Sequence, residues 1–232
     1  MKIQAIIAAA GCGTRMNSQS PKIRLEIHGR AIISYTIDVF DKCPSVASLI
    51  LVVPADDISF YSDYVSSLHL GKKIKVVAGG ETRFHSVGNG LKASDRDTEV
   101  VIIHDAARPL LSASVLSQAI NLSKQYPALV VAVEVKSTIK RVYPKTLLVQ
   151  ETLNREELWE IQTPQIFRKS LLEDAYRKYD GLSSPTDDAS LIEAMGEKVK
   201  VLKGEYSNIK ITTKEDLVIA QALISLSPGK EA

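Results

Sequence analysis

The sequence predicts an α/β fold with a doubly wound, mostly parallel sheet. Two observations lead to it: short apolar runs recur along the chain, and segments with helical periodicity lie between them. With 232 residues, of which 45% are hydrophobic, the chain can form one large domain, which we place at residues 1–232.

Five apolar runs are expected to form the strands of this sheet. Each is nearly continuous rather than alternating, which is typical of strands covered by helices on both faces. The runs are residues 3–10, 48–54, 73–78, 98–105 and 128–135.

Three helices are expected between these strands, at residues 31–42, 83–93 and 112–125. The first places Ile33, Ile37 and Phe40 on one face, and the third begins after Ser112, a candidate N-cap. Repetition of strand, helix and strand favours right-handed crossovers and a doubly wound sheet.

The pattern breaks at residues 136–166. Here residues 137–153 alternate around Tyr143-Pro144-Lys145, which predicts a β-hairpin with a proline turn. An isolated hairpin is only marginally stable in water, so we expect this protruding arm to pack on a second subunit.

The remaining residues return to the α/β pattern. Helices are predicted at 168–179, 184–196 and 213–226, and a strand at 198–204. In the second of these helices Pro185 suits the first position, and Asp187 and Asp188 suit the first turn.

The composition argues against several classes of protein. A net charge of +2, without a basic stripe, gives no electrostatic case for binding nucleic acid. No apolar run is long enough to cross a membrane, so no membrane partner is expected. Two cysteines, Cys12 and Cys43, are too few for a disulfide framework, and we expect a cytoplasmic protein.

A glycine-rich loop, "AAAGCGTRMNSQSPK", follows the first strand. In an open parallel sheet, ligands bind outside the carboxyl ends of the strands, and small residues let the backbone approach a phosphate. The loop lacks the Gly-Lys-Ser/Thr ending of a Walker A motif, and Met16 replaces the third glycine of a dinucleotide fingerprint. Arg15 and Lys22 suit a triphosphate under attack, whereas the simpler alternative is a tight turn with two solvated cations.

Five ordered motifs carry a resemblance to a known family. The loop resembles the Gly-x-Arg-Met…Pro-Lys signature of sugar-nucleotide-type nucleotidyltransferases, which have a Rossmann-like fold. The segments "GGETRFHSV", "HDAARP", "TPQIF" and "NIKIT" then resemble, in order, segments of the 2-C-methyl-D-erythritol 4-phosphate cytidylyltransferases of isoprenoid biosynthesis. The resemblance implies that CTP and methylerythritol phosphate react, with Mg²⁺, to give pyrophosphate and the CDP-linked alcohol.

The resemblance also implies roles for individual residues. Arg15 and Lys22 match stabilisers of the transition state, and Arg155 and Lys210 match the pair that holds the substrate phosphate. The positions that match the surroundings of the cytidine are Ala9, Ala10, Gly11, Gly80, Glu81 and Ser86. Asp105, Thr138 and Thr163 match positions near the sugar alcohol.

The family further implies a homodimer in which the arm at 137–153 brings Thr138 and Arg155 into the partner's site. Mg²⁺ would bridge phosphate oxygens and need few protein ligands, and the sequence does not identify those ligands. His104 is expected to be structural because the nucleophile, a phosphate oxygen, needs no general base. Ile23 stands where the family usually has Gln, which affects packing beside Lys22.

Two other functions stay open at this point. A ribitol 5-phosphate cytidylyltransferase shares the fold and most motifs, although Ala107 favours the methylerythritol phosphate enzyme. A nucleotide-binding protein without activity is the second alternative, and the four separated cations argue against it.

Overall fold

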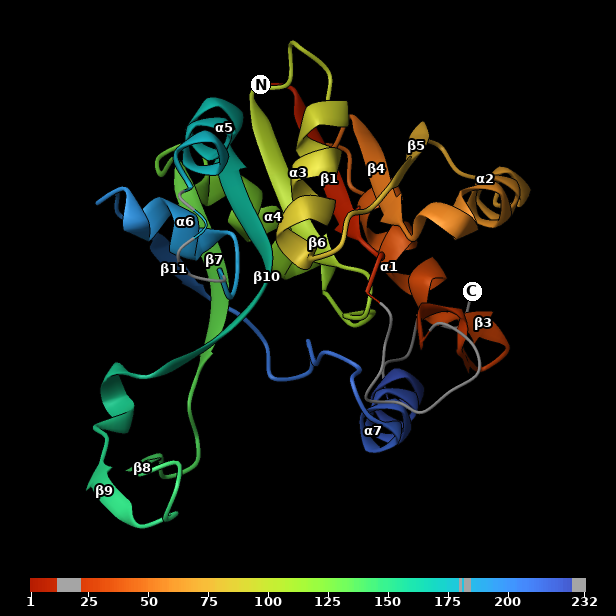
Figure 1. The fold of residues 1–232 in the computed structure, drawn as a ribbon. Helices are drawn as coiled ribbons and strands as arrows, with labels where there is room; N and C mark the ends of the chain where they lie inside the picture. The colour runs from red at the N-terminus through yellow and green to blue at the C-terminus, as the bar shows by residue number, and fades with distance from the viewer. Residues whose placement is uncertain (12–21, 180, 182–184, 227–232) are drawn as a thin grey trace.

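A seven-stranded mixed sheet forms the centre of the protein (Figure 1). The computed structural model describes residues 1–11, 22–179, 181 and 185–226, and only the backbone of Lys22. Six strands run parallel and β10 runs antiparallel between β7 and β6. Their order is β11 (Lys200–Lys203), β7 (Ala128–Glu134), β10 (Trp159–Arg168), β6 (Val100–Asp105), β1 (Ile3–Ala8), β4 (Ser48–Val53) and β5 (Ile74–Ala78).

The predicted doubly wound, mostly parallel sheet is therefore confirmed, with one strand that the sequence patterns missed. Strand β10 falls at the end of the region where the α/β pattern breaks. Its buried positions include the polar residues Gln162, Thr163 and Gln165, and Pro164 interrupts it. Proline is rarely found inside a central strand, and polar residues hide the apolar run that marks one.

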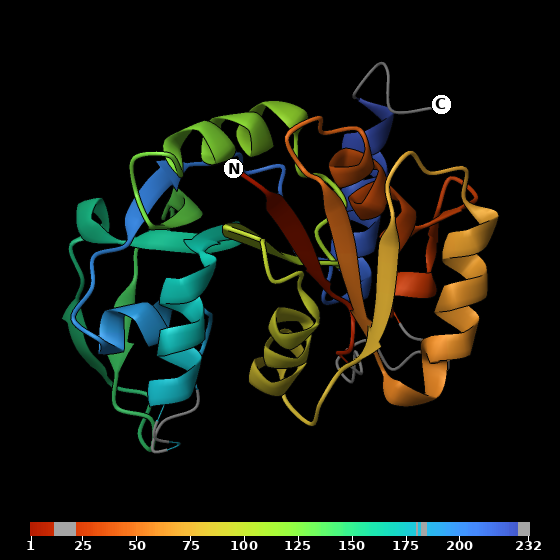
Figure 2. The same ribbon diagram turned by 90° about the horizontal axis from the view of Figure 1, so that it is seen from above.

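Helices cover both faces of the sheet (Figure 2). Along β1, Ile3 and Ile7 point into one core cluster and Ile6 into the other, as the two-residue period of a strand requires. Helices α1 (Ile32–Asp41), α2 (Ile58–Ser67) and α4 (Ala113–Leu122) contribute to the first cluster. The second contains residues of α3 (Arg83–Ala93), α5 (Lys169–Lys178) and α6 (Ala189–Ala194).

Among the described helices, α3, α4 and α7 (Lys214–Ser225) begin with a side-chain cap, from Thr82, Ser112 and Thr213. Ser112 caps α4 as predicted, because its side chain accepts a hydrogen bond from the Val115 amide. Helix α7 begins with a capping box formed by Thr213 and Asp216. It packs in a third cluster with the short strand β2 (Glu26–Ile27), which pairs with β3 (Arg30–Ala31).

The predicted start of the 184–196 helix is wrong. Helix α6 begins at Ala189, and Pro185 precedes it rather than opening it. Gln165 of β10 supplies the physical reason, since its side-chain oxygen accepts a hydrogen bond from the Ala189 amide at 3.2 Å. A tertiary contact thus satisfies an amide at the helix start.

The predicted hairpin is a separate two-stranded sheet formed by β8 (Lys140–Val142) and β9 (Val149–Thr152). It protrudes from the main body of the protein (Figure 1), and every residue of its two strands is exposed. We call residues 137–153 the arm. Within the described residues, no helix has the length and apolar character that a membrane span requires.

Candidate active site

The small residues after β1 lie at the mouth of the sheet. Hydrogen bonds hold this backbone: the Ala9 amide donates to the Val52 carbonyl at 2.8 Å, and the Ala106 amide donates to the Ala8 carbonyl at 3.0 Å. The ends of β1, β4 and β6 are therefore fixed relative to one another. The glycine loop continues into residues 12–21, so Arg15 lies outside the described residues, as does the side chain of Lys22.

A cavity of about 620 Å³ opens at these strand ends. Its volume lies in the range of small-molecule sites. Eight of the residues assigned to the site from the sequence line it: Ala9, Ala10, Gly11, Gly80, Glu81, Ser86, Asp105 and Lys210.

The segment from Gly79 to Ser86 forms one wall of the cavity. A Cβ on Gly79 would lie 2.4 Å from Ala10 Cβ, and a Cβ on Gly80 would lie 2.4 Å from His85 Cβ, so both positions require glycine. The buried Ser86 hydroxyl accepts a hydrogen bond from the Gly80 amide and lies 2.9 Å from the Thr82 carbonyl, to which it can donate. Ser86 thus fixes the shape of this backbone from beneath.

Asp105 lines the same cavity and is surrounded by three cations. One carboxylate oxygen lies 2.7 Å from Lys210 Nζ and 3.8 Å from Arg108 Nε, and the other lies 3.5 Å from Arg83 Nε. Burial alone would raise the pKa of Asp105, but the charges of Lys210, Arg83 and Arg108 outweigh burial and hold this pKa below its usual value. Asp105 is therefore an ionised carboxylate at neutral pH.

A buried hydrogen-bond chain holds Asp105 from behind. His104 Nε2 donates to the Arg108 carbonyl at 3.1 Å, which leaves His104 Nδ1 to accept from the Thr163 hydroxyl at 2.9 Å. The Thr163 oxygen in turn accepts from the Asp105 amide at 3.1 Å. Burial lowers the pKa of His104 to about 4, so its ring is neutral and structural, as predicted.

Lys210 is placed by the segment before α7. The Ile211 amide donates to the Ala107 carbonyl at 2.8 Å, and Arg108 Nη1 donates to the Asn208 carbonyl at the same distance. These contacts join residues 208–211 to the loop after β6. Lys210 itself is partly exposed toward the cavity.

Three assigned residues do not line this cavity. Thr163 lies behind Asp105, with its hydroxyl in the chain described above. Thr138 is exposed on the arm. Arg155, in the short 3-10 helix η4 (Arg155–Glu157), lines a separate cavity of about 420 Å³ at the base of the arm.

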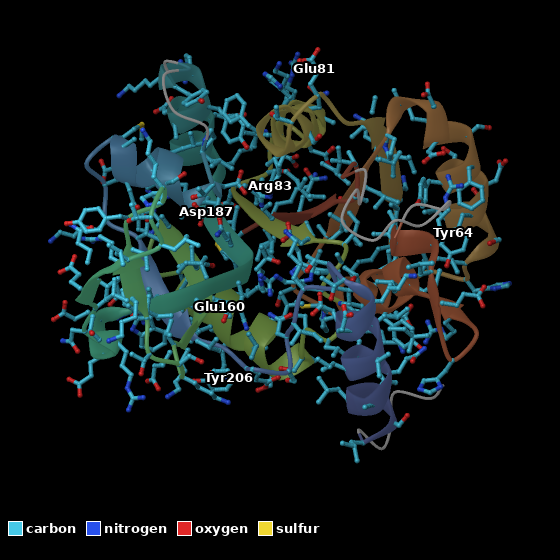
Figure 3. The ribbon with its side chains drawn as sticks, turned by 60° about the horizontal axis from the view of Figure 1, so that its bottom comes forward. Tyr64, Glu81, Arg83, Glu160, Asp187 and Tyr206 are labelled. Atoms are coloured by element: carbon cyan, nitrogen blue, oxygen red, sulfur yellow. The ribbon has the colours of Figure 1, made fainter. Side chains whose placement is uncertain are left out.

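The structure adds site residues that the sequence patterns did not single out. Arg83, which is labelled in Figure 3, lines the cavity and lies 3.5 Å from Asp105. Arg108, inside the motif "HDAARP", is buried against Asp105. Arg83 stands inside the motif "GGETRFHSV", directly after a candidate helix cap, which was the available signal. Asp188 pairs with Arg83 at 2.7 Å, whereas the sequence suggested only a helix-dipole role.

Among the described residues there is no group of three or more His, Cys, Asp or Glu side chains that could hold a metal ion. The Asp105 carboxylate, which lines the cavity, is already paired with cations. The described residues therefore do not form a dedicated metal site.

A doubly wound sheet, glycine-rich backbone at its mouth and a cluster of cations at the same cavity fit a nucleotidyltransferase. The family model for 2-C-methyl-D-erythritol 4-phosphate cytidylyltransferase matches residues 3–226. The chain belongs to this family, and it is an enzyme, a cytidylyltransferase.

Similar proteins cover nearly the whole chain. The 2-C-methyl-D-erythritol 4-phosphate cytidylyltransferase of Caldanaerobacter subterraneus is 41% identical, over 97% of this chain and 99% of its own length. That of Geobacillus kaustophilus is also 41% identical, over 97% and 98%.

Solved structures give the same result. The 4-diphosphocytidyl-2C-methyl-D-erythritol synthase of Anaerococcus prevotii superposes with a TM-score of 0.85 at 37% identity, over 97% of this chain and 98% of that one. The Thermus thermophilus cytidylyltransferase gives 0.77 at 28% identity, over 97% and 100%. These similarities favour the methylerythritol phosphate enzyme over the ribitol 5-phosphate enzyme and over a protein without activity.

Proposed function

We propose that this protein transfers the cytidylyl group of CTP to 2-C-methyl-D-erythritol 4-phosphate. An oxygen of the acceptor phosphate forms a bond to the α-phosphorus of CTP, in line with the bond that breaks. Pyrophosphate leaves with the electrons of that bond, and the CDP-linked methylerythritol remains. The observation that carries the proposal is one cavity that is lined both by the glycine-containing segments 9–11 and 79–80 and by Asp105 with Lys210.

The glycine-containing segments suit the nucleotide. The lining includes the small residues Ala9, Ala10, Gly11 and Gly80, whose short side chains leave the backbone accessible, together with Glu81 and Ser86. Backbone amides and carbonyls can contact the base, ribose and phosphates at close range, where larger side chains would block the approach. This arrangement supports cytidine binding between the two segments.

The charged residues of the lining suit the acceptor. The Asp105 carboxylate can accept hydrogen bonds from alcohol groups, and Lys210 can bind a phosphate. The nucleophile is already an anion, so the reaction requires positioning and cations rather than a base. The buried, neutral His104 is consistent with this requirement.

Arg15 and Lys22 complete the proposal as the cations that stabilise the transition state at the α-phosphorus. Both follow the described end of the glycine loop at Gly11 in the sequence. Replacing either with Ala is expected to lower turnover by roughly two to three orders of magnitude, as loss of a charged transition-state contact does elsewhere. Normal turnover in folded Lys22→Ala protein would remove this role.

Mg²⁺ is the proposed cofactor. The described residues fit an ion held mainly by phosphate oxygens and water, because they form no dedicated ligand cluster. The ion would neutralise charge on the triphosphate and shape it for attack. What the chain supplies is orientation: Asp105 and Lys210 hold the acceptor while the glycine backbone holds the nucleotide.

The active form is proposed to be a homodimer with shared sites, built from one domain at 1–232 and its arm. Support comes from the arm itself, whose apolar residues Tyr143, Leu147, Leu148 and Val149 are between 52% and 76% exposed. An exposed apolar patch on a projecting hairpin favours burial against another surface. Thr138 and Arg155 would then reach the partner's cavity. We also place the enzyme in the cytoplasm, with no nucleic acid or membrane partner.

The test measures pyrophosphate release with CTP and Mg²⁺ in the presence of methylerythritol phosphate, ribitol 5-phosphate or no acceptor. Release that depends on methylerythritol phosphate is the expected result. Release with ribitol 5-phosphate alone would preserve the mechanism and change the substrate. No release with either acceptor, in protein shown to be folded, would overturn the proposed function.

A further inference from the structure

Arg83 lies between two aspartates. Its Nη1 is 2.7 Å from Asp188 Oδ2, and its Nε is 3.5 Å from Asp105 Oδ1. The guanidinium therefore joins a carboxylate of the cavity to a carboxylate that lies outside it. Asp188 is almost completely buried, at 1% exposure.

The position of Asp188 is fixed by its second oxygen. Tyr176 donates a hydrogen bond from its hydroxyl to Asp188 Oδ1 at 2.7 Å. The Tyr176 ring stacks on Phe84, the neighbour of Arg83 in α3, with ring centroids 4.6 Å apart. The ring also packs closely on Gly88, where an added Cβ would lie 3.2 Å from Tyr176 Cε1 and would require the ring to shift by a few tenths of an ångström.

A helix-capping role does not explain Asp188. Its side chain makes no capping hydrogen bond to α6. That work is done by the preceding residue, because Asp187 Oδ1 accepts from the Ser190 amide at 3.0 Å. The two adjacent aspartates therefore have different functions, and Asp188 is directed to Arg83.

Strand β10 supports both ends of this arrangement. Gln165 Nε2 donates to Asp187 at 2.7 Å and thereby fixes the segment that carries Asp188. Two residues earlier on the same strand, Thr163 accepts from the Asp105 amide. Strand β10 thus positions the Asp105 backbone through Thr163 and, through Gln165 and Asp187, the segment whose Asp188 holds Arg83.

The charges around Asp105 suggest what Arg83 and Asp188 do during the reaction. Lys210 pairs with Asp105 at 2.7 Å in the structure, yet Lys210 is also the cation assigned to the acceptor phosphate. When Lys210 turns toward phosphate, its hold on Asp105 weakens. Arg83 and the buried Arg108 then remain to keep the carboxylate ionised and oriented.

We propose that Asp188 is a positioning residue that holds Arg83 against Asp105, so that Asp105 keeps its orientation toward the acceptor alcohol when Lys210 binds the acceptor phosphate. This inference rests on the proposed function. It predicts a defect specific to the acceptor, because Asp105 is the residue assigned to the acceptor alcohol, whereas the positions assigned to the cytidine act largely through backbone groups.

The experiment compares Asp188→Asn, Arg83→Met and the double variant, with Asp187→Asn as the matched control. The control makes the same chemical change one residue away. Initial rates are measured while methylerythritol phosphate and CTP are varied in turn. Asp188→Asn is expected to raise the KM for methylerythritol phosphate about tenfold and to change the KM for CTP by less than about twofold.

The double variant separates positioning from a general loss of structure. If Asp188 acts through Arg83, Asp188→Asn adds nothing to the acceptor KM of the Arg83→Met protein. Asp187→Asn keeps an amide oxygen that can accept from Ser190 or Gln165, so it is expected to lower the melting temperature and to change the acceptor KM much less than Asp188→Asn does. An unchanged acceptor KM in Asp188→Asn, or effects that multiply in the double variant, would overturn the inference.

A measurement without turnover distinguishes failure of this inference from failure of the proposed function. The Arg83 Nε–H signal, followed by NMR, is expected to exchange slowly in the wild-type protein and fast in Asp188→Asn. Equal exchange in both proteins would remove the positioning role. Wild-type protein that is inactive with methylerythritol phosphate would instead overturn the function alone. Should Asp188→Asn not fold, Arg83→Lys carries the kinetic tests, since an ammonium group lacks the spread, planar donors with which the guanidinium contacts the two aspartates.

Discussion

Two regions of this protein hold their charged side chains in opposite ways. Around Asp105 the cations are packed against carboxylates, with Arg108 buried and Arg83 half-buried. At the base of the arm Arg155 is exposed and donates to the Lys136 carbonyl at 3.2 Å. Within the sheet, burial and pairing fix the geometry before any substrate binds. At the arm, the side chains assigned to the substrate are presented outward, as a site completed by another subunit requires.

The sharpest test of this comparison combines the two regions in mixed dimers. Lys210→Ala and Arg155→Ala are each expected to lower turnover about a thousandfold, since each removes a cation assigned to the acceptor phosphate. After subunit exchange, half of the dimers are mixed and each mixed dimer has one intact site, so about a quarter of wild-type activity returns.

The control is a mixture of Lys210→Ala with Asp105→Asn. Both residues line the same cavity of one chain. In a mixed dimer of these two variants, each cavity therefore lacks either Lys210 or the Asp105 carboxylate, and no site is intact. Recovery in the first mixture and none in the second supports shared sites. Failure of the first mixture, with exchange confirmed, would assign each complete site to one chain.

Removing the charge at the centre of the buried cluster is expected to have the next largest effect. Asp105→Asn leaves Lys210, Arg83 and Arg108 without their shared carboxylate, which should lower the free energy of unfolding by about 3 kcal/mol. Urea denaturation at pH 7 measures the change. A loss below about 1 kcal/mol would mean that the cluster is as well solvated as the arm.

The pH dependence of stability should originate in the sheet rather than in the arm. His104 has a pKa of about 4 in the folded protein and about 6.5 when unfolded, so the unfolded chain binds more protons between these values. Stability is therefore complete above about pH 6.5 and falls as the pH is lowered toward 4, by roughly 3 kcal/mol.

His104→Gln should flatten this decline, because an amide can still hydrogen-bond to Thr163 or Arg108 without titrating. The arm contains no histidine and cannot contribute to this window. Thermal unfolding of both proteins at intervals from pH 4 to 7 tests the assignment. Parallel curves for the two proteins would place the titrating group elsewhere.

The smallest effect is expected from the exposed ion pair on the arm. Arg141 and Glu151 pair across β8 and β9 in full contact with solvent. Glu151→Gln should change the free energy of unfolding by less than about 1 kcal/mol, because exposed pairs are screened by water and salt. A loss as large as that of Asp105→Asn would show that this pair is buried, as in a dimer contact.

The sequence predicts the strands and the cavity because each depends on local patterns. Apolar runs mark β1, β4, β5, β6 and β7, and the small residues Ala9, Ala10 and Gly11 mark the mouth of the sheet. Strand β10 was missed because its buried Gln162, Thr163 and Gln165 are polar, and their hydrogen bonds to distant segments are invisible in a local window.

Asp188 is a second case in which local sequence rules failed, because they assigned it a role that the tertiary contacts replace. Its position after Pro185 and Asp187 matches the local rules for a helix start, and those rules gave it a dipole role. Its actual partners, Arg83 and Tyr176, come from two other helices. Only the fold brings these residues together, so the ion pair with Arg83, rather than the helix dipole, determines the position of the Asp188 side chain.

Strand β10 limits where insertions and deletions can be tolerated in this chain. Its ten residues join the arm to the contacts behind Asp105, and side chains alternate between the faces of a strand. An insertion or deletion of one residue inside it would move Thr163 and Gln165 away from their partners together. The turn at the tip of the arm, residues 143–148, can gain or lose residues without this cost. Natural variation in length should therefore collect at the tip and be absent from β10.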